Sequence, residues 1–379
     1  MTAKNSQTRN QEFELTIDSL SYFGGRGVGR VGGRTDGRVV FVPRTAPGDR
    51  VRVRVVADKG RFLEAELTEI LENSPHRREP PCRYFERCGG CAWQHVDYRT
   101  QSEQKEKIVR DSFRRLEKRA PIEWLPFIKA PDEFGYRNRI QVQTQGSDFG
   151  FFARRTRELV KIDRCLIAED AINRELKDLE PDPNSRKIEI ALQPDGQVRV
   201  MPNERDPEAA LFSQVNSKQN EALISRLLAL IRVEPDWILD LYAGSGNLTC
   251  SLRERFPGVP IRAVELSRGA VARGRAELPD VEWLAEDVEA ALRRMRRPAG
   301  RGLVVLDPPR AGVSAQVVES LARLSPEQIL YVSCNPSTAA RDIERWLERG
   351  GLPLQKVQGL DMFPQTEHVE IVASLCGAI

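Results

Sequence analysis

Residues 237–247 read Trp-Ile-Leu-Asp-Leu-Tyr-Ala-Gly-Ser-Gly-Asn, an apolar run that leads directly into a glycine-rich turn. The run predicts a buried strand, and the turn predicts the beginning of a helix. Two later apolar runs, 303–306 and 329–332, end just before Asp307 and Cys334. Because open α/β sheets hold their ligands at the carboxyl ends of strands, we expect the glycine turn, the carboxylate and the thiol at one edge.

The same strand and helix alternation extends over the whole carboxyl-terminal half of the chain. It begins at about Phe212 and predicts βαβ units in a mostly parallel, doubly wound domain over residues 212–379. The full length of 379 residues exceeds that of one small core and indicates two or three domains. The sequence therefore predicts an α/β protein with further domains before residue 212.

Composition restricts the class of protein. No stretch of about 18 consecutive apolar residues is present, so no membrane helix is expected. Residues 1–11 are polar, lack the apolar core of a secretory signal and predict a disordered tail, which favours a cytoplasmic protein. In such a compartment the seven cysteines indicate metal binding or catalysis rather than disulfides.

The amino-terminal region, residues 12–72, alternates apolar and polar residues in short runs that glycine-rich breaks separate. This pattern predicts short strands in a small OB-like β-barrel. The first 60 residues carry eleven Lys and Arg against six Asp and Glu, and Arg26, Arg30, Arg34 and Arg38 lie in or beside the glycine loop. Such a basic module favours a polyanionic partner whose phosphates the arginines reach, with a solvated arginine-rich face as the alternative.

Four cysteines mark the central region, residues 73–211. Cys82, Cys88 and Cys91 give the spacing C-x5-C-x2-C, and Cys165 lies far downstream. Four thiolates suit either zinc or an iron–sulfur cluster. A structural zinc site more often pairs two short knuckles, so this spacing favours a [4Fe–4S] cluster. Unrelated buried cysteines are the third interpretation.

Acidic residues after successive strands indicate a nucleoside-containing cofactor. Glu265 follows the second strand, where an acid typically accepts ribose hydroxyls, and Asp287 follows another short strand, where it would accept from an adenine amine. The pattern Gly244-x-Gly246-x-x-Thr249 lacks the third glycine of the dinucleotide fingerprint, which disfavours a nicotinamide cofactor. S-adenosylmethionine is favoured instead, with solvated acids of an ordinary doubly wound domain as the alternative.

Cys334 and Glu370 are the candidate catalytic pair. Asp307-Pro308-Pro309-Arg310 is similar to the D-P-P-aromatic loop of amino-methyltransferases, but Arg310 replaces the aromatic residue and disfavours attack by an exocyclic amine. A thiolate added to carbon 6 of a pyrimidine makes carbon 5 nucleophilic toward a methyl sulfonium, and a general base must then remove the carbon-5 proton. The alternative for Cys334 is a buried structural cysteine, and the alternative for Glu370 is a surface carboxylate.

These residues together resemble a known family, the RNA uracil-5 methyltransferases. The resemblance extends from about residue 12 to the carboxyl terminus. The amino-terminal barrel looks like a TRAM domain, and several motifs fall in the order that the family shows. Those motifs are Pro80-Pro81-Cys82 with Cys88-Gly89-Gly90-Cys91, Tyr136–Arg139, Phe212–Asn216, Asp307–Arg310, Ser333–Pro336 and Asp361–Pro364.

The resemblance implies roles for individual residues. Cys334 would be the nucleophile and Glu370 the base. Cys82, Cys88, Cys91 and Cys165 would ligate the cluster. The residues expected around S-adenosylmethionine are Gln214, Tyr242, Asn247, Glu265, Asp287 and Asp307. The resemblance also implies that a helix near residues 101–118 packs on the carboxyl-terminal domain.

We therefore expect three parts: a TRAM barrel, a central α/β domain with a [4Fe–4S] cluster and a Rossmann-like class I methyltransferase domain. The expected reaction transfers methyl from S-adenosylmethionine to carbon 5 of a uridine in structured RNA, with large-subunit ribosomal RNA ahead of transfer RNA. No membrane and no obligate protein partner is expected. Two rivals are a radical methylthiotransferase, whose C-x3-C-x2-C triplet this chain lacks, and a non-catalytic iron–sulfur RNA-binding protein.

Overall fold

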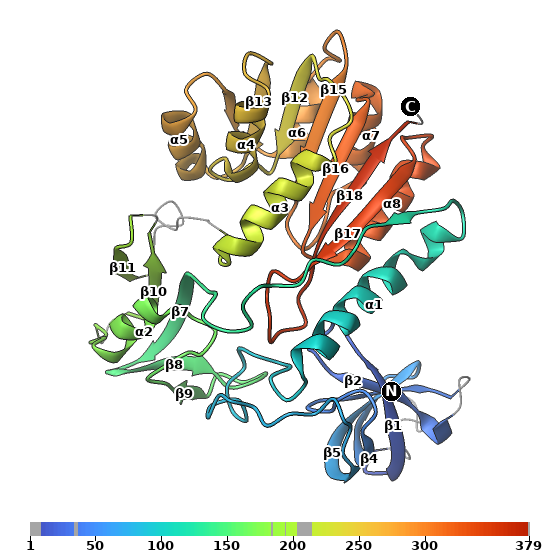
Figure 1. Cartoon of the computed structure of the whole chain (residues 1–379), viewed down its shortest axis with the longest axis vertical. Helices are drawn as coiled ribbons and strands as arrows, with labels where there is room; N and C mark the ends of the chain where they lie inside the picture. Colours follow the sequence, from blue (N-terminus) through green and yellow to red (C-terminus); the bar gives the residue numbers. More distant parts are fainter. Residues whose placement is uncertain (1–8, 34–36, 183–184, 194, 203–213, 378–379) are drawn as a thin grey trace. The chain divides into compact units, whose positions relative to one another are not determined.

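A computed structural model describes residues 9–33, 37–182, 185–193, 195–202 and 214–377 of the chain (Figure 1). Most of the expected disordered tail, Arg34 and Phe212 therefore lie outside the described residues.

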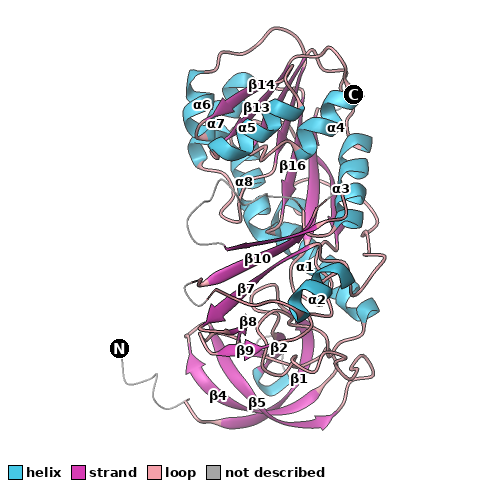
Figure 2. Cartoon of the chain, turned by 90° about the vertical axis from the view of Figure 1, so that its left-hand side faces the viewer, coloured by secondary structure: helices cyan, strands magenta, loops and turns pink. Residues whose placement is uncertain are grey.

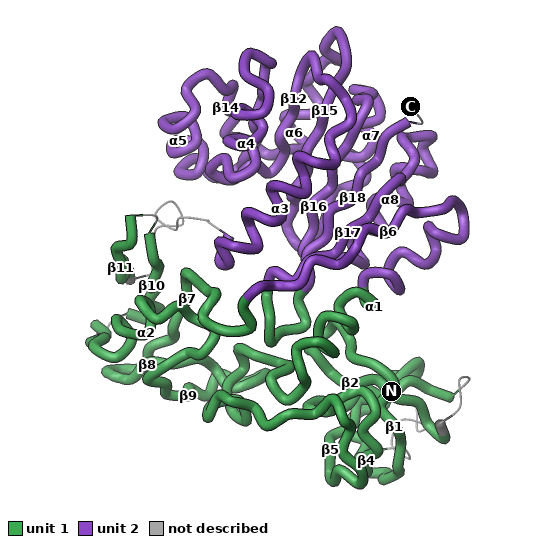
Figure 3. The backbone as a smooth tube through the Cα atoms, viewed as in Figure 1, with its two compact units in different colours: residues 1–108, 132–202, 363–368 green, residues 109–131, 203–362, 369–379 purple. Residues whose placement is uncertain are grey.

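The chain divides into two compact units (Figure 3). Unit 1 comprises Met1–Ile108, Asp132–Pro202 and Phe363–His368, and unit 2 comprises Val109–Pro131, Asn203–Met362 and Val369–Ile379. The four cysteines predicted to ligate a cluster belong to unit 1, and Cys334 and Glu370 belong to unit 2.

Unit 1 begins with a closed five-stranded barrel in the order β1-β2-β3-β5-β4 (Figure 1). The elements are β1 (Glu12–Leu20), β2 (Gly27–Arg30), the short helix η2 (Val31–Gly33), β3 (Val39–Val42), β4 (Arg50–Asp58) and β5 (Phe62–Glu72). Side chains alternate between the two faces of a strand, so Val51, Val53 and Val55 of β4 are fully buried in the barrel core. The barrel that the sequence predicts is present.

A second sheet in unit 1 is antiparallel throughout and has the order β11-β10-β7-β8-β9. Its elements are β7 (Arg139–Gln145), β8 (Asp148–Phe152), β9 (Leu159–Lys161), α2 (Asp170–Lys177), β10 (Lys187–Leu192) and β11 (Val198–Pro202). Helix α2 buries Ile172 and Leu176 completely, and both belong to one core with Ile140 and Ile190 of the strands.

The long helix α1 (Tyr98–Glu117) contains the boundary between the two units. In its first half Gln101 and Lys105 are fully buried, and the Lys105 ammonium donates to the Phe363 carbonyl at 2.9 Å. In its second half the Phe113 ring lies edge-on to Trp124, and the Ser112 hydroxyl lies 3.2 Å from that of Ser337. The second half of this helix thus packs on residues of unit 2.

Unit 2 is built on an eight-stranded sheet with the order β14-β13-β12-β15-β16-β18-β17-β6. Strands β12 to β16 are parallel where they pair, whereas β18 runs antiparallel to both β16 and β17. The strands are β6 (Glu123–Trp124), β12 (Trp237–Leu241), β13 (Ile261–Glu265), β14 (Glu282–Ala285), β15 (Gly302–Leu306), β16 (Gln328–Ser333), β17 (Leu354–Leu360) and β18 (Glu370–Cys376). Strand order reverses between β12 and β15, which is where doubly wound folds bind ligands.

Helices cover both faces of this sheet (Figure 2). They are α3 (Ser217–Ala229), α4 (Asn247–Arg255), α5 (Arg268–Glu277), α6 (Val288–Arg294), α7 (Ala315–Leu324) and α8 (Pro336–Glu348). Helices α3 and α4 lie on one side, and α6, α7 and α8 lie on the other. Because both faces are covered, the central strands are buried along their whole length. Within the described ranges, no helix is both long and apolar enough to cross a bilayer.

Candidate active site

One edge of the unit 2 sheet collects the predicted reactive residues. Asp307 directly follows β15, Cys334 directly follows β16, and Glu370 is the first residue of β18. Strands β15 and β16 are parallel, and β18 is antiparallel to β16, so these three strand ends lie at the same edge. The thiol and both carboxylates therefore converge although 63 residues of sequence separate Asp307 from Glu370.

The register between β16 and β18 sets the relation between the thiol and the base. Ser333 pairs with Ile371 in this antiparallel ladder, so the next step along each strand places Cys334 opposite Glu370. Directly opposed residues in such a ladder project to the same face, with their Cβ atoms about 5 Å apart. Glu370 is 3% exposed, whereas Cys334 is half-buried and more open to solvent. The ladder thus presents a thiol beside a buried carboxyl group.

Cys334 is a thiol rather than a thiolate at neutral pH in this arrangement. Burial and the neighbouring Glu370 carboxylate raise its pKa to about 11, and Asp307 adds to this effect. Arg310 opposes it through its positive charge and a side-chain hydrogen bond to Cys334. Arg310 is therefore the group that stabilises the thiolate form.

Two carboxyl groups at this edge hold protons unusually tightly. Burial and the charge of Asp307 raise the pKa of Glu370 well above its ordinary value, and Arg310 acts in the opposite direction. Burial raises the pKa of Asp307 to about 6. A carboxyl group whose pKa lies nearer to neutrality is suited to accepting a proton in a catalytic step.

Asn335 connects the strand end to the loop that carries Arg310. Its side chain accepts from the Thr338 N–H at the beginning of α8, and its Nδ2 donates to the Arg310 carbonyl at 3.2 Å. The Asn335 N–H also donates to the Ser333 hydroxyl at 3.0 Å. The sequence predicted Asn335 only as part of the motif Ser333–Pro336. An N-cap residue directly before Pro336 was the available signal for its structural role.

The glycine turn after β12 is held by the acid at the end of β13. The Glu265 carboxylate accepts from the Gly244 N–H at 3.1 Å and from the Ser267 N–H at 2.8 Å. Gly246 has φ 106°, so its backbone conformation favours glycine, and a Cβ there would make a tight contact, 3.2 Å from the Trp283 ring. The structure therefore brings the predicted ribose acid and the predicted glycine turn together.

Tyr242 and Asp287 lie at the same edge. Burial and the Asp287 carboxylate raise the pKa of the Tyr242 phenol to about 12. Tyr242 also has φ 63°, a left-handed backbone conformation that is rare for non-glycine residues and frequent at functional turns. Asp287 is the N-cap of α6 and accepts from the Ala290 N–H at 3.1 Å. Its second carboxylate oxygen is not required by the cap.

Two further predicted cofactor residues differ in their surroundings. Asn247 begins α4, and its amide exchanges two hydrogen bonds with Asn220, at 2.8 and 2.9 Å. Gln214 is half-buried at the start of the described part of unit 2. The structure gives Asn247 a definite partner inside the protein.

Two residues of this edge were not singled out from the sequence. Asp240 in β12 is fully buried, and its side-chain carboxyl group accepts a hydrogen bond from the Thr249 hydroxyl at 2.6 Å. Burial raises its pKa to about 7, and the charges of Asp307 and Glu265 act in the same direction. Leu266 is 68% exposed directly after Glu265. An apolar residue after the strand-end acid was the signal available for Leu266.

The four predicted ligand cysteines of unit 1 line one cavity of about 250 Å³. Cys82, Cys88, Cys91 and Cys165 are all half-buried free thiols. Burial raises the pKa of Cys91 to about 12 and that of Cys165 to about 11, and the cysteines' charges act on one another in the same direction. In the described residues, no group of three or more His, Cys, Asp or Glu side chains lies close enough together to hold a metal ion as it stands. Four thiols around one cavity are a donor set that suits either an iron–sulfur cluster or zinc.

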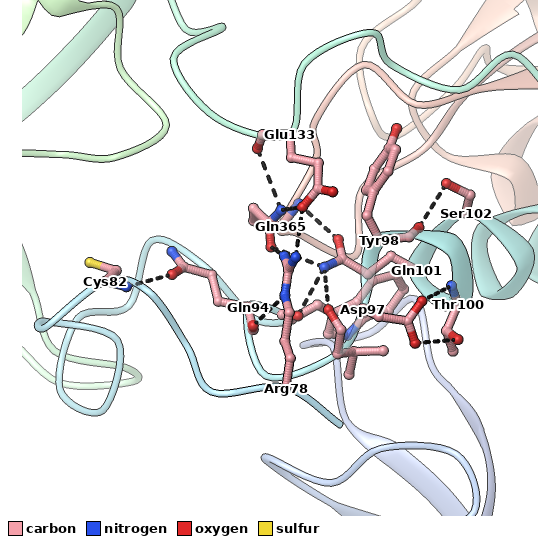
Figure 4. Close-up of polar contacts among 12 residues, drawn as sticks. Arg78, Cys82, Gln94, Asp97, Tyr98, Thr100, Gln101, Ser102, Glu133 and Gln365 are labelled. Carbon is pink, nitrogen blue, oxygen red and sulfur yellow. Dashed lines mark hydrogen bonds and ion pairs between the residues drawn. The ribbon is translucent and has the colours of Figure 1, made fainter. Parts of the chain in front are cut away.

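A buried polar network joins the cysteine segment to residues 363–368 (Figure 4). Gln365 is fully buried and has φ 70°. Its backbone N–H donates to Gln101 Oε1 at 3.0 Å. Its Oε1 accepts from Gln101 Nε2 at 2.9 Å and from Arg78 Nη2 at 3.0 Å. Arg78 Nε donates to the Gln94 carbonyl, and Gln94 Oε1 accepts from the Cys82 N–H at 3.2 Å. The cysteine segment and the 363–368 loop are thus parts of one network.

Comparison with known proteins places these features among RNA methyltransferases. Residues 6–68 match the model of the TRAM domain, and residues 300–376 match the model of the tRNA (uracil-5-)-methyltransferase family. A Bdellovibrio bacteriovorus protein described as an uncharacterized RNA methyltransferase is 36% identical, over 99% of each chain.

Two further similarities concern proteins with a named activity. The 23S rRNA (uracil(1939)-C(5))-methyltransferase RlmD of Pseudomonas putida is 30% identical over 89% of each chain. Among solved structures, the Pyrococcus abyssi tRNA (uracil-54, C5)-methyltransferase in complex with S-adenosyl-L-homocysteine superposes with a TM-score of 0.70. It shares 25% identity and covers 96% of this chain and 100% of its own.

Proposed function

The chain belongs to the family of RNA uracil-5 methyltransferases, and from that premise we propose that it methylates carbon 5 of a uridine in large-subunit ribosomal RNA through a covalent adduct of Cys334. The observation that carries this proposal is that Cys334 and Glu370 lie opposite each other where β16 ends and β18 begins. The similarity to 23S rRNA methyltransferases favours ribosomal RNA, whose cytoplasmic location the enzyme would share. The tRNA enzyme of Pyrococcus abyssi makes transfer RNA the second candidate.

In the proposed reaction the Cys334 thiol gives its proton to water and its sulfur bonds to carbon 6 of the uracil, while the electrons of the carbon 5–carbon 6 double bond move toward the carbon-4 carbonyl to form an enolate. Arg310 stabilises the thiolate that this step requires, against the effect of burial. S-adenosylmethionine supplies the methyl group as an electrophilic sulfonium, and the adduct makes carbon 5 nucleophilic toward it. Glu370 then takes the carbon-5 proton, the carbon 5–carbon 6 double bond re-forms and the Cys334 thiolate leaves. The target base must leave its stack to reach the thiol, which costs a few kcal/mol.

We assign the cofactor to the edge where β12, β13 and β15 end. Glu265 would accept from the ribose hydroxyls, since two backbone N–H groups already fix its carboxylate. Asp287 would accept from the adenine amine, and exposed Leu266 would cover one face of the purine. Tyr242, Asn247, Asp307 and Gln214 complete the proposed set.

We further propose that Cys82, Cys88, Cys91 and Cys165 hold a [4Fe–4S] cluster. Their common cavity and their burial support this assignment. Methyl transfer moves no net electrons, so the cluster would stabilise unit 1 rather than take part in the reaction. A brown protein with visible absorption that Cys88→Ser abolishes is expected. A colourless, zinc-containing protein purified without oxygen would contradict the assignment.

The proposed function is tested with RNA that carries 5-fluorouridine at the target position. Fluorine prevents the last proton removal, so the wild-type protein should remain covalently attached to the RNA on a denaturing gel, and Cys334→Ala should not. Mapping of 5-methyluridine in cells that lack the protein identifies the substrate. Loss of one 23S position supports the proposal, loss of a transfer-RNA position selects the second candidate, and methylation by Cys334→Ala rejects the mechanism.

A further inference from the structure

Phe23 has an environment that packing alone does not explain. The described part of the chain leaves four large apolar side chains exposed, and Phe23, at 63%, is the single aromatic residue among them. An exposed phenyl ring contributes nothing to the barrel core, which is formed by other residues. A single exposed apolar side chain is common on protein surfaces. Phe23 differs from the other three because its ring contacts Tyr22 and an exposed arginine lies beside its turn.

Hydrogen bonds and close packing hold the turn that carries Phe23. The Phe23 carbonyl accepts a hydrogen bond from Arg26 Nε at 3.3 Å. The Gly25 carbonyl accepts one from Trp93 Nε1 at 2.9 Å. Gly25 has φ 59°, and a Cβ there would lie 2.4 Å from the Ala92 Cβ. Glycine is therefore required, and the turn packs directly against the segment that holds the cysteines.

The Phe23 ring is the end of a series of aromatic contacts. Tyr22 lies edge-on to Phe23 with 5.4 Å between ring centroids, and His368 lies edge-on to Tyr22 at 6.0 Å. Phe363 in turn lies 6.1 Å from His368. These edge-to-face contacts fix the direction of the ring, which lowers the entropy cost of placing a planar ligand on it.

Two arginines of the turn between β8 and β9 border the same site. Arg154 Nη1 donates to the Gly24 carbonyl at 3.4 Å, and its Nη2 donates to the Cys91 carbonyl at 2.6 Å. Arg155 is exposed, and one of its guanidinium nitrogens would lie 3.8 Å from a Cβ placed on Gly24. A flexible, exposed cation therefore lies beside the turn that presents the exposed ring.

The charge at this turn differs from that on the rest of the barrel. Arg50, Arg52 and Arg54 on the outer face are paired with Glu14, Glu66, Glu69 and Glu72. Two of the four arginines predicted to reach phosphates are also paired, Arg26 with Glu64 and Arg38 with Asp58, each at 2.8 Å. At the Phe23 turn, Arg26, Arg154 and Arg155 lie near two acids, since Arg155 acts on Glu64, the partner of Arg26, and Glu367 acts on Arg154. An excess of positive charge therefore remains at this turn, which the paired arginines of the outer face do not provide.

We propose that Phe23 and Arg155 form a binding site for one unpaired nucleotide of the RNA substrate, whose base stacks on Phe23 while Arg155 contacts its phosphate. Proteins recognise single-stranded RNA by stacking bases on aromatic rings and by placing cations along the backbone. The inference rests on the proposed function, because it assumes an RNA substrate. It adds a nucleotide site within unit 1, separate from the residues that react.

The first test measures the affinity for a fluorescein-labelled single-stranded RNA of mixed sequence, about 12 nucleotides long, by fluorescence anisotropy. Loss of one base–aromatic stack weakens binding about 5- to 150-fold, which is the loss expected for Phe23→Ala. Phe23→Trp should retain the affinity because indole also stacks. Val56→Ala removes another exposed apolar side chain of the same barrel and is the matched control, expected to bind as the wild type does.

The second test separates stacking from charge. Arg155→Ala should reduce the slope of log K against log salt by about 0.7, the value for one phosphate contact on a single strand. Phe23→Ala should weaken binding without changing that slope. Binding of S-adenosylhomocysteine, measured by calorimetry, should be equal in all variants and shows that unit 2 is folded in each, while equal hydrogen-exchange protection of the barrel amides shows the same for unit 1.

Each outcome has a definite meaning. Equal RNA affinity of Phe23→Ala and the wild type overturns the inference and leaves Phe23 as a surface for another protein. If the wild type forms 5-methyluridine in that case, the proposed function stands although the nucleotide site fails. If the wild type binds RNA through Phe23 but never forms the adduct with 5-fluorouridine RNA, the nucleotide site stands and the proposed function fails.

Discussion

Cys334 and Glu370 stand opposite each other where the antiparallel pair of β16 and β18 begins, one step beyond the pair Ser333 and Ile371. The carboxylate is buried, and its charge is the largest electrostatic cause of the raised pKa of the thiol. In the proposed mechanism this neighbourhood lets Cys334 add to the pyrimidine ring and lets Glu370 later remove a proton from the same ring. This relationship makes the following outcomes testable.

Replacement of Glu370 by glutamine should separate the two halves of the reaction. The amide preserves the size of the side chain but accepts no proton, so turnover should fall about 100- to 10,000-fold. The covalent RNA adduct should then accumulate with ordinary uridine RNA and be visible on a denaturing gel. Glu319→Gln, an exposed change on α7, is the control and should neither slow turnover nor trap RNA. Undiminished turnover of Glu370→Gln would show that another group removes the proton.

The alkylation of Cys334 by iodoacetamide should depend on pH in a defined direction. Its pKa is raised to about 11 by burial first and by Glu370 second, and only the thiolate reacts. The labelling rate should therefore keep rising from neutral pH toward pH 11. Glu370→Gln removes the negative charge that Glu370 carries once it is ionised, which lowers the pKa of the thiol. Labelling should therefore be faster in this variant at pH values that are below about 11 and high enough to ionise Glu370.

Mass spectrometry of the Cys250 peptide supplies the internal control for this experiment. Cys250 lies in α4, and the charges that act on its pKa are those of Glu254 and Glu277. Its labelling rate should be the same in both proteins. Slower labelling of Cys334 in Glu370→Gln would contradict the assigned electrostatic relationship.

Asp49 should be a main determinant of barrel stability. Its fully buried carboxylate accepts from the N–H groups of Ala46 at 2.6 Å and Ser74 at 2.9 Å and from Arg77 Nη2 at 2.7 Å. Burial raises its pKa, but the hydrogen bonds of Arg77, Ala46 and Ser74 outweigh this and lower it overall. Asp49→Asn breaks a buried ion pair and should lower the free energy of unfolding of the barrel by about 3–5 kcal/mol. Hydrogen exchange of the barrel amides measures this loss.

The pH dependence of that stability follows from the same shift. A carboxyl group with a lowered folded-state pKa stabilises the barrel fully above its unfolded pKa of about 3.9, and this stabilisation is lost as the pH falls below it. Glu69→Gln is the control, because Glu69 forms an exposed pair with Arg52 and should cost about 1 kcal/mol or less. Equal costs for the two substitutions would refute the assignment.

Gln101 should hold the 363–368 loop in place. Its Nε2 donates to the carbonyls of Trp93 and Val96 and to Gln365, and its Oε1 accepts from the Gln365 N–H. Gln101→Ala leaves buried polar groups without partners, at about 1–3 kcal/mol each. Hydrogen exchange at residues 363–368 should accelerate markedly. Glu103→Ala, an exposed change on the same helix, should leave it unaltered, and slow exchange in Gln101→Ala would contradict the role.

Much of the fold was predictable because it depends on local patterns. Apolar runs that end in polar residues gave the parallel strands and the positions of Asp307 and Cys334 at their ends. Alternation in residues 12–72 gave the barrel, since each strand there has one buried face. The cavity shared by Cys82 and Cys165 was not predictable from spacing, because it needs the β7–β11 sheet to bring the downstream cysteine back.

The sequence by itself determined the order of strands and helices, the residue at each strand end and the family to which the pattern belongs, because hydrophobic periodicity and turn residues act over a few positions. Only the tertiary structure decided that Glu370 faces Cys334. That result requires β18 to insert antiparallel between β16 and β17, a pairing between distant segments in which a shift of one residue would turn the carboxylate to the other face. The exposure of Phe23 is likewise tertiary, since it depends on which surfaces the rest of unit 1 leaves uncovered.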